Sequence, residues 1–184
     1  MSRVCHIAVI LLFLVIPPVL ADRGPESTLN RLFAALHGTQ DHVEGNRLTS
    51  LIWQIWNHPQ DPETAVLMTE GREALEKLDF ETAENRFNQV IGRAPAMAEG
   101  WNKRATLYYV MGKFEDSIRD IRRVLELEPR HFGALAGLGM NYDALGDKHK
   151  ALNAWRKALE ANPHLADAPA RILQLETELG RQSI

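Results

Sequence analysis

The side chains that could carry out catalysis or hold a metal ion are scattered through this chain of 184 residues. Its seven histidines show no His-Glu-x-x-His spacing, which would place two zinc ligands and a general base on one helix. Ser117 replaces an alanine in a repeated apolar pattern, so we expect it to pack in the core and not to act as a nucleophile. Arg130 and His131 precede a predicted helix, where they either meet a phosphate or carboxylate or cap the helix locally. The sequence therefore predicts no catalytic residue, no metal site, no cofactor and no enzymatic activity.

The charge pattern argues against nucleic acid as a partner. The chain carries 21 Lys and Arg against 24 Asp and Glu, a formal net charge of −3. Opposite charges alternate along predicted helix surfaces, as in Glu70, Arg72 and Glu73, and no basic stripe is present. This pattern is typical of solvated helix faces with modest pairing three or four positions apart. We expect a protein or peptide partner and no nucleic acid.

Three prolines mark an internal repeat. Pro95, Pro129 and Pro163 are evenly spaced, since 129 − 95 and 163 − 129 are both 34. The residues between them align as two amphipathic helices per unit, with small and bulky apolar residues in matching columns. These columns include Gly71, Ala105 and Gly139 in the first helix and Phe87, Ile121 and Trp155 in the second. A period of this length predicts a helical solenoid with a concave face that is open to partners.

The columns resemble the tetratricopeptide repeat (TPR) family over residues 64–163, as three full units. The run AEGWNKRATLYY followed by EPRHFGALAGLG resembles a subtype found in small exported bacterial proteins. The resemblance implies an all-α, right-handed solenoid of helical hairpins that serves as a protein-binding scaffold. We expect its units at 64–97, 98–131 and 132–165. The remaining segment, 166–184, should hold a capping helix, because its apolar stripe is backed by polar residues that can face water.

Residues 22–63 are expected to form an N-terminal helix pair, which is either a degenerate repeat or a cap. Apolar stripes at helical spacing predict helices near 27–37 and 41–57. Trp53 lies 34 residues before the phenylalanine column of the first unit, which is the offset expected of a decayed repeat. We expect Trp53 and Trp56 to pack in a core; the alternative is that they are exposed anchors for a partner or a membrane.

The first 21 residues predict a secretory signal peptide. Arg3, an apolar run over 7–16 and a small residue before Asp22 are typical of such signals. The alternative is an uncleaved anchor, but the run is too short to span a bilayer and two prolines follow it. Cleavage would remove Cys5, the only cysteine, and leave 163 residues (184 − 21) with 20 basic and 24 acidic side chains, a net charge of −4. We expect an exported protein in the periplasm, with no integral membrane segment after cleavage.

The concave groove should be lined by the first helix of each unit, at positions between its core residues. In register these positions hold Ala65, Met68, Arg72 and Glu76, then Glu99, Asn102, Thr106 and Tyr109, then Gly133, Ala136, Met140 and Asp143. The predicted partner-binding residues among them are Arg72, Asn102, Thr106, Tyr109, Gly133, Ala136, Met140 and Asp143. Gly133 and Gly137 are costly within a helix. Either they thin the groove floor for a partner's backbone or apolar side chain, or tight helix packing requires them.

Two further expectations concern charged residues. TPR proteins that bind chaperone C-termini hold the terminal carboxylate with lysine, asparagine and arginine, and here most of that cluster is missing. Arg72 beside Asn102 either holds one acidic group or is a solvated pair. Glu70 and Arg104 are one repeat apart, and we expect them to form a partly shielded structural ion pair that fixes the register of neighbouring units. Two separate surface charges are the alternative.

Together these features favour a scaffold that binds a protein or peptide through its concave groove, in envelope assembly or maintenance. The alternative is a permanent accessory subunit of a larger periplasmic or membrane-associated complex. An exposed apolar face around Phe33, Trp53 or Trp56 would favour that alternative.

Overall fold

The computed structural model describes residues 25–59 and 61–182, so the expected signal peptide lies outside the described residues. Within these ranges the chain forms α-helices joined by short turns, without a strand. The helices are α1 (Pro25–Gly38), α2 (His42–Trp56), α3 (Pro62–Glu76), α4 (Phe80–Arg93), α5 (Ala98–Val110), α6 (Phe114–Leu127), α7 (Phe132–Ala144), α8 (Lys148–Ala161) and α9 (Ala168–Gln182). None of these helices is long and apolar enough to cross a membrane.

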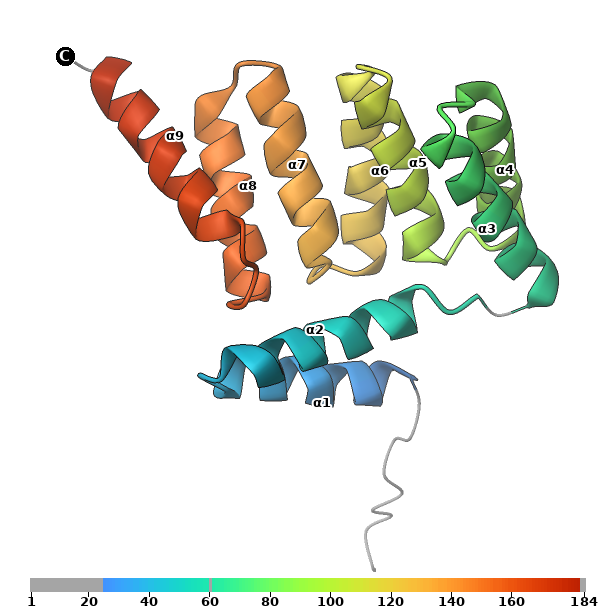
Figure 1. Cartoon of the computed structure of the whole chain (residues 1–184), viewed down its shortest axis with the longest axis horizontal. Helices are drawn as coiled ribbons and strands as arrows, with labels where there is room; N and C mark the ends of the chain where they lie inside the picture. Colours follow the sequence, from blue (N-terminus) through green and yellow to red (C-terminus); the bar gives the residue numbers. More distant parts are fainter. Residues whose placement is uncertain (1–24, 60, 183–184) are drawn as a thin grey trace, which may run out of the picture.

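Three helical hairpins, α3–α4, α5–α6 and α7–α8, stand side by side in a row (Figure 1). From α3 to α9, each helix packs on the next helix in the chain. The final helix, α9, covers α8 with Ala168, Ile172 and Leu175 against Trp155. The described residues thus confirm the predicted all-α helical-repeat solenoid.

The repeated small residues have a steric role in each hairpin. A Cβ atom built on Gly71 would lie 2.6 Å from the ring of Phe87, and one built on Gly139 would lie 2.6 Å from Trp155. Glycine therefore lets the aromatic side chain of the second helix lie directly against the backbone of the first. Phe87 is completely buried as a result. Close packing of this kind leaves little room for volume changes.

The N-terminal hairpin does not extend the row, which corrects the expectation of a degenerate repeat or cap ahead of α3. Instead, α1 and α2 run crosswise beneath the solenoid, along the edge that carries the α6–α7 and α8–α9 turns (Figure 1). The open face of α3 explains the difference. Val66 is 53% exposed there, whereas the matching Gly100 and Ala134 are buried by the preceding hairpin. Glu73 is also exposed, where the next unit has the buried Leu107. Only part of this face is apolar, so it has less need of an apolar cover than the same face of α5.

The hairpin is held to the third unit by apolar and polar contacts. The apolar stripes of α1 and α2 close on Phe132, at the start of α7, in one buried cluster. At one end, Arg130 Nη1 donates to Asn30 Oδ1 at 2.7 Å and its guanidinium lies 4.4 Å from the ring centroid of Phe33. At the other end, Asn162 Nδ2 donates to Thr49 Oγ1 at 3.1 Å. The hairpin therefore spans the edge of two successive units.

Candidate groove between α5, α7 and α2

One cavity gathers most of the predicted groove residues. It has a volume of about 300 Å³ and is lined by Asn102, Thr106, Tyr109, Gly133, Ala136 and Met140, together with Trp53, Lys103, Ala105, Ser117, Ile121, Gly137 and Asn141. The predicted members lie on the facing sides of α5 and α7. Their spacing of three or four residues brings them onto one face of each helix, as the sequence indicates.

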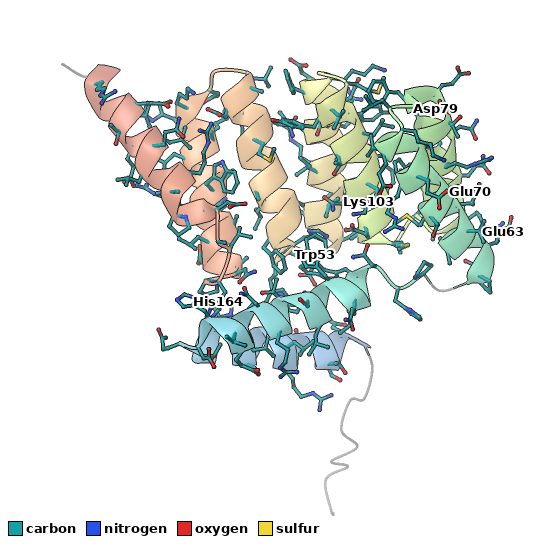
Figure 2. All side chains as sticks on the ribbon, viewed as in Figure 1. Trp53, Glu63, Glu70, Asp79, Lys103 and His164 are labelled. Carbon is teal, nitrogen blue, oxygen red and sulfur yellow. The ribbon has the colours of Figure 1, made fainter. Side chains whose placement is uncertain are left out.

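Trp53 forms an end wall of this cavity, and it comes from α2 (Figure 2). A Cβ atom added to Gly133 would lie 2.5 Å from the Trp53 ring. Gly133 is therefore explained by tight packing against α2, the second of the two alternatives for this glycine, and it still lines the cavity. Neighbouring rings also fix the orientation of the Trp53 indole. Its ring centroid lies 5.3 Å from that of Phe132 and 5.4 Å from that of Trp56, in edge-on contacts.

A second cavity, of about 600 Å³, continues the first toward α9. The two share Tyr109 and Met140 as lining residues, so they adjoin, and we call them together the groove across α5, α7 and α9. Asp143 lines the second part, where it forms ion pairs with Arg171 and with Lys148, the latter at 2.6 Å. The groove thus has an apolar end under Trp53 and a charged end at α9.

Several residues expected in the groove lie elsewhere. Arg72 is exposed on α3 and lines neither of the two cavities, so it does not join Asn102. Met68 is buried in the core between α3 and α4. Glu99 is buried and faces the turn before α7. The predictions for Met68 and Glu99 fail because a helix in this row is covered on more than one side, which a single helical stripe does not show.

Glu99 lies at the centre of a buried polar network. His131 Nδ1 accepts a hydrogen bond from the backbone N–H of Ala134 at 3.1 Å, so the ring proton is on Nε2. Nε2 then donates to Glu99 Oε2 at 3.1 Å, and Asn102 Nδ2 donates to the same oxygen at 3.0 Å. Lys103 Nζ lies 2.8 Å from Glu99 Oε1. The expected local capping by His131 is present, and it is joined to the second unit through Glu99.

The network also reaches the N-terminal hairpin. The imidazole of His131 stacks on the indole of Trp56, with centroids 4.1 Å apart and planes 10° from parallel. Burial by itself would raise the pKa of Glu99, but the hydrogen bond from His131 and the charge of Lys103 outweigh burial and lower this pKa below its usual 4.5. Glu99 is therefore ionised at neutral pH. The carboxylate, imidazole and indole together connect α5, α7 and α2.

A second buried network fixes Asn141 beneath the groove. Ser117 Oγ donates to the carbonyl of Ala105 at 2.8 Å and accepts from Asn141 Nδ2 at 3.0 Å. The same Nδ2 donates to the carbonyl of Gly137 at 2.8 Å. Because that carbonyl can only accept, the orientation of the Asn141 amide is set. Its Oδ1 is buried and accepts no hydrogen bond from the residues that the structure describes.

The predicted ion pair between Glu70 and Arg104 is wrong. Arg104 instead donates to both carboxylate oxygens of Asp120, at 2.7 and 2.8 Å, and its third nitrogen donates to Asn88 at 2.6 Å. Glu70 pairs with Arg86 at 2.7 Å on the partly exposed side of the first hairpin. Arg104 still links neighbouring units, because Asn88 belongs to α4. The sequence could not indicate Asp120, whose carboxylate is buried on the second helix of the unit.

A third cavity, of about 890 Å³, lies between the N-terminal hairpin and the turns that precede α5 and α7. Trp56, Pro95 and Pro129 contribute its apolar walls, and Arg93 and Arg130 lie at its edge. Both guanidinium groups are already paired, with Asp61 and Glu128 respectively. This cavity is a junction between the hairpin and the solenoid. Sequence reasoning did not indicate it, because it depends on where the hairpin docks.

The fold and its groove define a class of protein: a helical-repeat solenoid whose first helices line a concave surface. Family models of the tetratricopeptide repeat match residues 68–110, 98–131 and 132–165. A TPR repeat-containing protein of Rhizobium etli is 32% identical over 159 residues, which are 86% of this chain and 78% of the relative. The chain belongs to the tetratricopeptide repeat family.

Solved structures are similar in fold. The Sgt2 TPR domain from Aspergillus fumigatus matches with a TM-score of 0.63 and 22% identity, over 67% of this chain and 83% of that one. The first TPR of Spaghetti, solved with an HSP90 peptide bound, matches with a TM-score of 0.62 and 19% identity, over 67% of this chain and 98% of that one. In both comparisons the matched share of this chain, 67%, is close to the share that the three hairpins and α9 occupy.

Proposed function

We propose that this protein is a non-enzymatic scaffold that binds a peptide segment of a protein partner in the groove formed by α5, α7 and α9. The observation that supports this function most is that the two cavities adjoin at Tyr109 and Met140. The Spaghetti TPR, which is similar in fold, was solved with an HSP90 peptide bound, and this supports a peptide as the ligand class. In this chain Met68 is buried and Arg72 faces away, so recognition of a terminal carboxylate by a basic cluster is not part of the proposal.

We further propose that the protein is exported to the periplasm and acts there in envelope assembly or maintenance. The signal-like residues 1–21 and the resemblance to small exported bacterial TPR proteins support this location. Mass spectrometry of the protein purified from the envelope fraction tests it. A mature N-terminus at Asp22 is expected, and an intact Met1 in a cytoplasmic fraction would contradict export.

The alternative function, a permanent accessory subunit, depends on an exposed apolar face around Phe33, Trp53 or Trp56. Phe33 and Trp56 are buried against Phe132, and Trp53 is half-buried against Gly133. The hairpin's aromatic side chains are therefore covered by this chain's own third unit. This burial favours a scaffold with a groove for a partner over a subunit that needs a second chain to cover α1 and α2.

Affinity capture from the native envelope fraction tests the groove. We expect a Tyr109→Ala, Met140→Ala variant to lose a partner that the wild type retains, because both side chains line both cavities. Leu173→Ala is the matched control, since Leu173 is exposed on α9 and lines neither cavity. Equal capture by all three proteins would rule out the groove as the binding surface.

A further inference from the structure

The cavity under Trp53 contains space that the chain itself leaves unfilled. A Cβ atom added to Gly137 would meet only Ile121 Cδ1, at 3.5 Å, which is ordinary van der Waals contact. Gly139 on the same helix is explained by Trp155 and Gly133 by Trp53, but no neighbouring side chain requires a glycine at 137. Since glycine within a helix costs about 0.5–1 kcal/mol relative to alanine, position 137 is better explained by what the hollow accommodates.

The second observation is the buried oxygen of Asn141. This side chain is 1% exposed and lines the same cavity. Its amide nitrogen is used by Ser117 and Gly137, which leaves Oδ1 as an acceptor without a donor among the described residues. A buried acceptor that lacks a donor costs about 1–3 kcal/mol. A donor from a ligand would recover this free energy.

The walls and the volume limit the kind of ligand. Ile121, Ala136, Met140 and Trp53 make the surroundings mainly apolar. A volume of about 300 Å³ cannot hold a helix, whose diameter with side chains is about 10–12 Å. A helix also uses its interior backbone N–H groups internally, whereas an extended chain has free N–H groups.

We infer that the cavity between Trp53, Gly137 and Asn141 receives one apolar side chain of an extended peptide segment, and that Asn141 Oδ1 accepts a hydrogen bond from the backbone N–H beside it. This inference rests on the proposed groove function and specifies its ligand. Trp53 closes the cavity on the side of α2, so the N-terminal hairpin shapes the site. The segment continues past Tyr109 and Met140 toward α9.

A random dodecapeptide display library, panned against four forms of the protein, tests the side-chain part. The forms are the wild type, Gly137→Leu, Gly92→Leu and the Tyr109→Ala, Met140→Ala variant. Leucine at 137 fills the hollow without a backbone clash, whereas Gly92 on α4 has nothing within 4 Å and serves as the matched control. We expect wild type and Gly92→Leu to enrich the same peptides with one fixed apolar position, and Gly137→Leu to bind them at least tenfold more weakly.

Three results separate the inference from the function. Peptides that need Tyr109 and Met140 but bind Gly137→Leu equally well would overturn the inference and leave the groove function standing. Fixed charged residues in place of the apolar position would also overturn it. If no enriched peptide depends on Tyr109 and Met140, both the inference and the groove function fail.

The hydrogen bond is tested on the wild-type protein, so the result does not depend on folding of a variant. Synthetic copies of one enriched peptide are N-methylated at one backbone nitrogen at a time, and their affinities are measured by calorimetry. Loss of the N–H at or directly after the apolar residue should weaken binding about tenfold, since it leaves Asn141 Oδ1 unpaired. N-methylation four residues away is the control. Equal affinity for every methylated peptide would overturn the role of Asn141.

Discussion

Glu70 and Arg104 hold the same place in successive repeats, yet their surroundings differ. The Glu70 pair with Arg86 is about half exposed, whereas Arg104 meets an Asp120 that is 3% exposed. Solvent screens the first pair and not the second. The position in the repeat predicted an ion pair between the two residues, which is wrong, because the partner of each residue and the strength of its pair depend on the second helix of the hairpin.

Arg104→Leu should therefore destabilise the protein by about 3–5 kcal/mol, because it leaves the Asp120 carboxylate buried without its cation. Arg86→Leu is the matched control, and we expect it to cost less than about 1 kcal/mol. Urea unfolding followed by circular dichroism measures both. Similar costs for the two variants would show that burial of Asp120 is unimportant.

Glu99 should make the protein sensitive to acid. Its pKa in the folded state lies below the ordinary value of 4.5, so its stabilising effect is fully present above that value and is lost as the pH falls through the folded-state pKa. Glu99→Gln should lower the stability at pH 7 and make it change less between pH 5 and pH 3. Glu70→Gln is the control on an exposed carboxylate. The same acid-dependent loss in Glu99→Gln as in the wild type would contradict this role.

At the scale of elements, the turns within the three hairpins show how repeats diverge. Gly112 and Gly146 have φ of 72° and 78°, and the matching Leu78 has φ of 59°. This left-handed region costs about 1–2 kcal/mol for a residue with a Cβ atom. Leu78 is 64% exposed, so packing does not offset the strain. The periodicity of the sequence predicts the turn in each hairpin. The strain at Leu78 arises because its turn adopts the same left-handed backbone conformation as the turns at Gly112 and Gly146.

Leu78→Gly should stabilise the protein by roughly 0.5–1 kcal/mol, because relief of strain exceeds the entropy that glycine adds to the unfolded chain. Gly146→Leu should have the opposite sign and cost about 1–2 kcal/mol. Thermal unfolding of the two variants beside wild type measures the difference. The same sign of change in both would contradict the shared turn geometry.

At the scale of the whole molecule, the N-terminal hairpin lies outside the row of repeats and docks on the third unit. A Cβ atom added to Gly45 on α2 would lie 2.3 Å from the ring of His164, in the turn before α9. His164 and His42 also meet edge to face, with ring centroids 5.6 Å apart. The hairpin therefore has a close contact at this end, opposite the one at Arg130.

Gly45→Leu should release the hairpin and leave the solenoid folded, since overpacking of this contact costs about 1–3 kcal/mol. Hydrogen exchange should become faster over 25–56 while α5 to α8 keep their protection, and tryptophan emission should shift to the red as Trp53 and Trp56 become exposed. Gly38→Ala is the control, because nothing lies within 4 Å of the added Cβ. Unchanged exchange in Gly45→Leu would show that the contact does not hold the hairpin.

The sequence by itself determined the helices, the repeat, the capping helix and most of the groove face, because these depend on spacing along one chain and on neighbouring units of equal length. Asn102, Thr106, Tyr109, Ala136 and Met140 lie together for that reason. Only the tertiary structure decided where α1 and α2 dock, and with them the end wall at Trp53 and the link from Trp56 to Glu99 through His131. A helical stripe indicates that a face must be buried, but the shape of the remaining apolar surface decides where. Here the edge of the third unit at Phe132, and not the face of α3 with its exposed Val66 and Glu73, holds the hairpin.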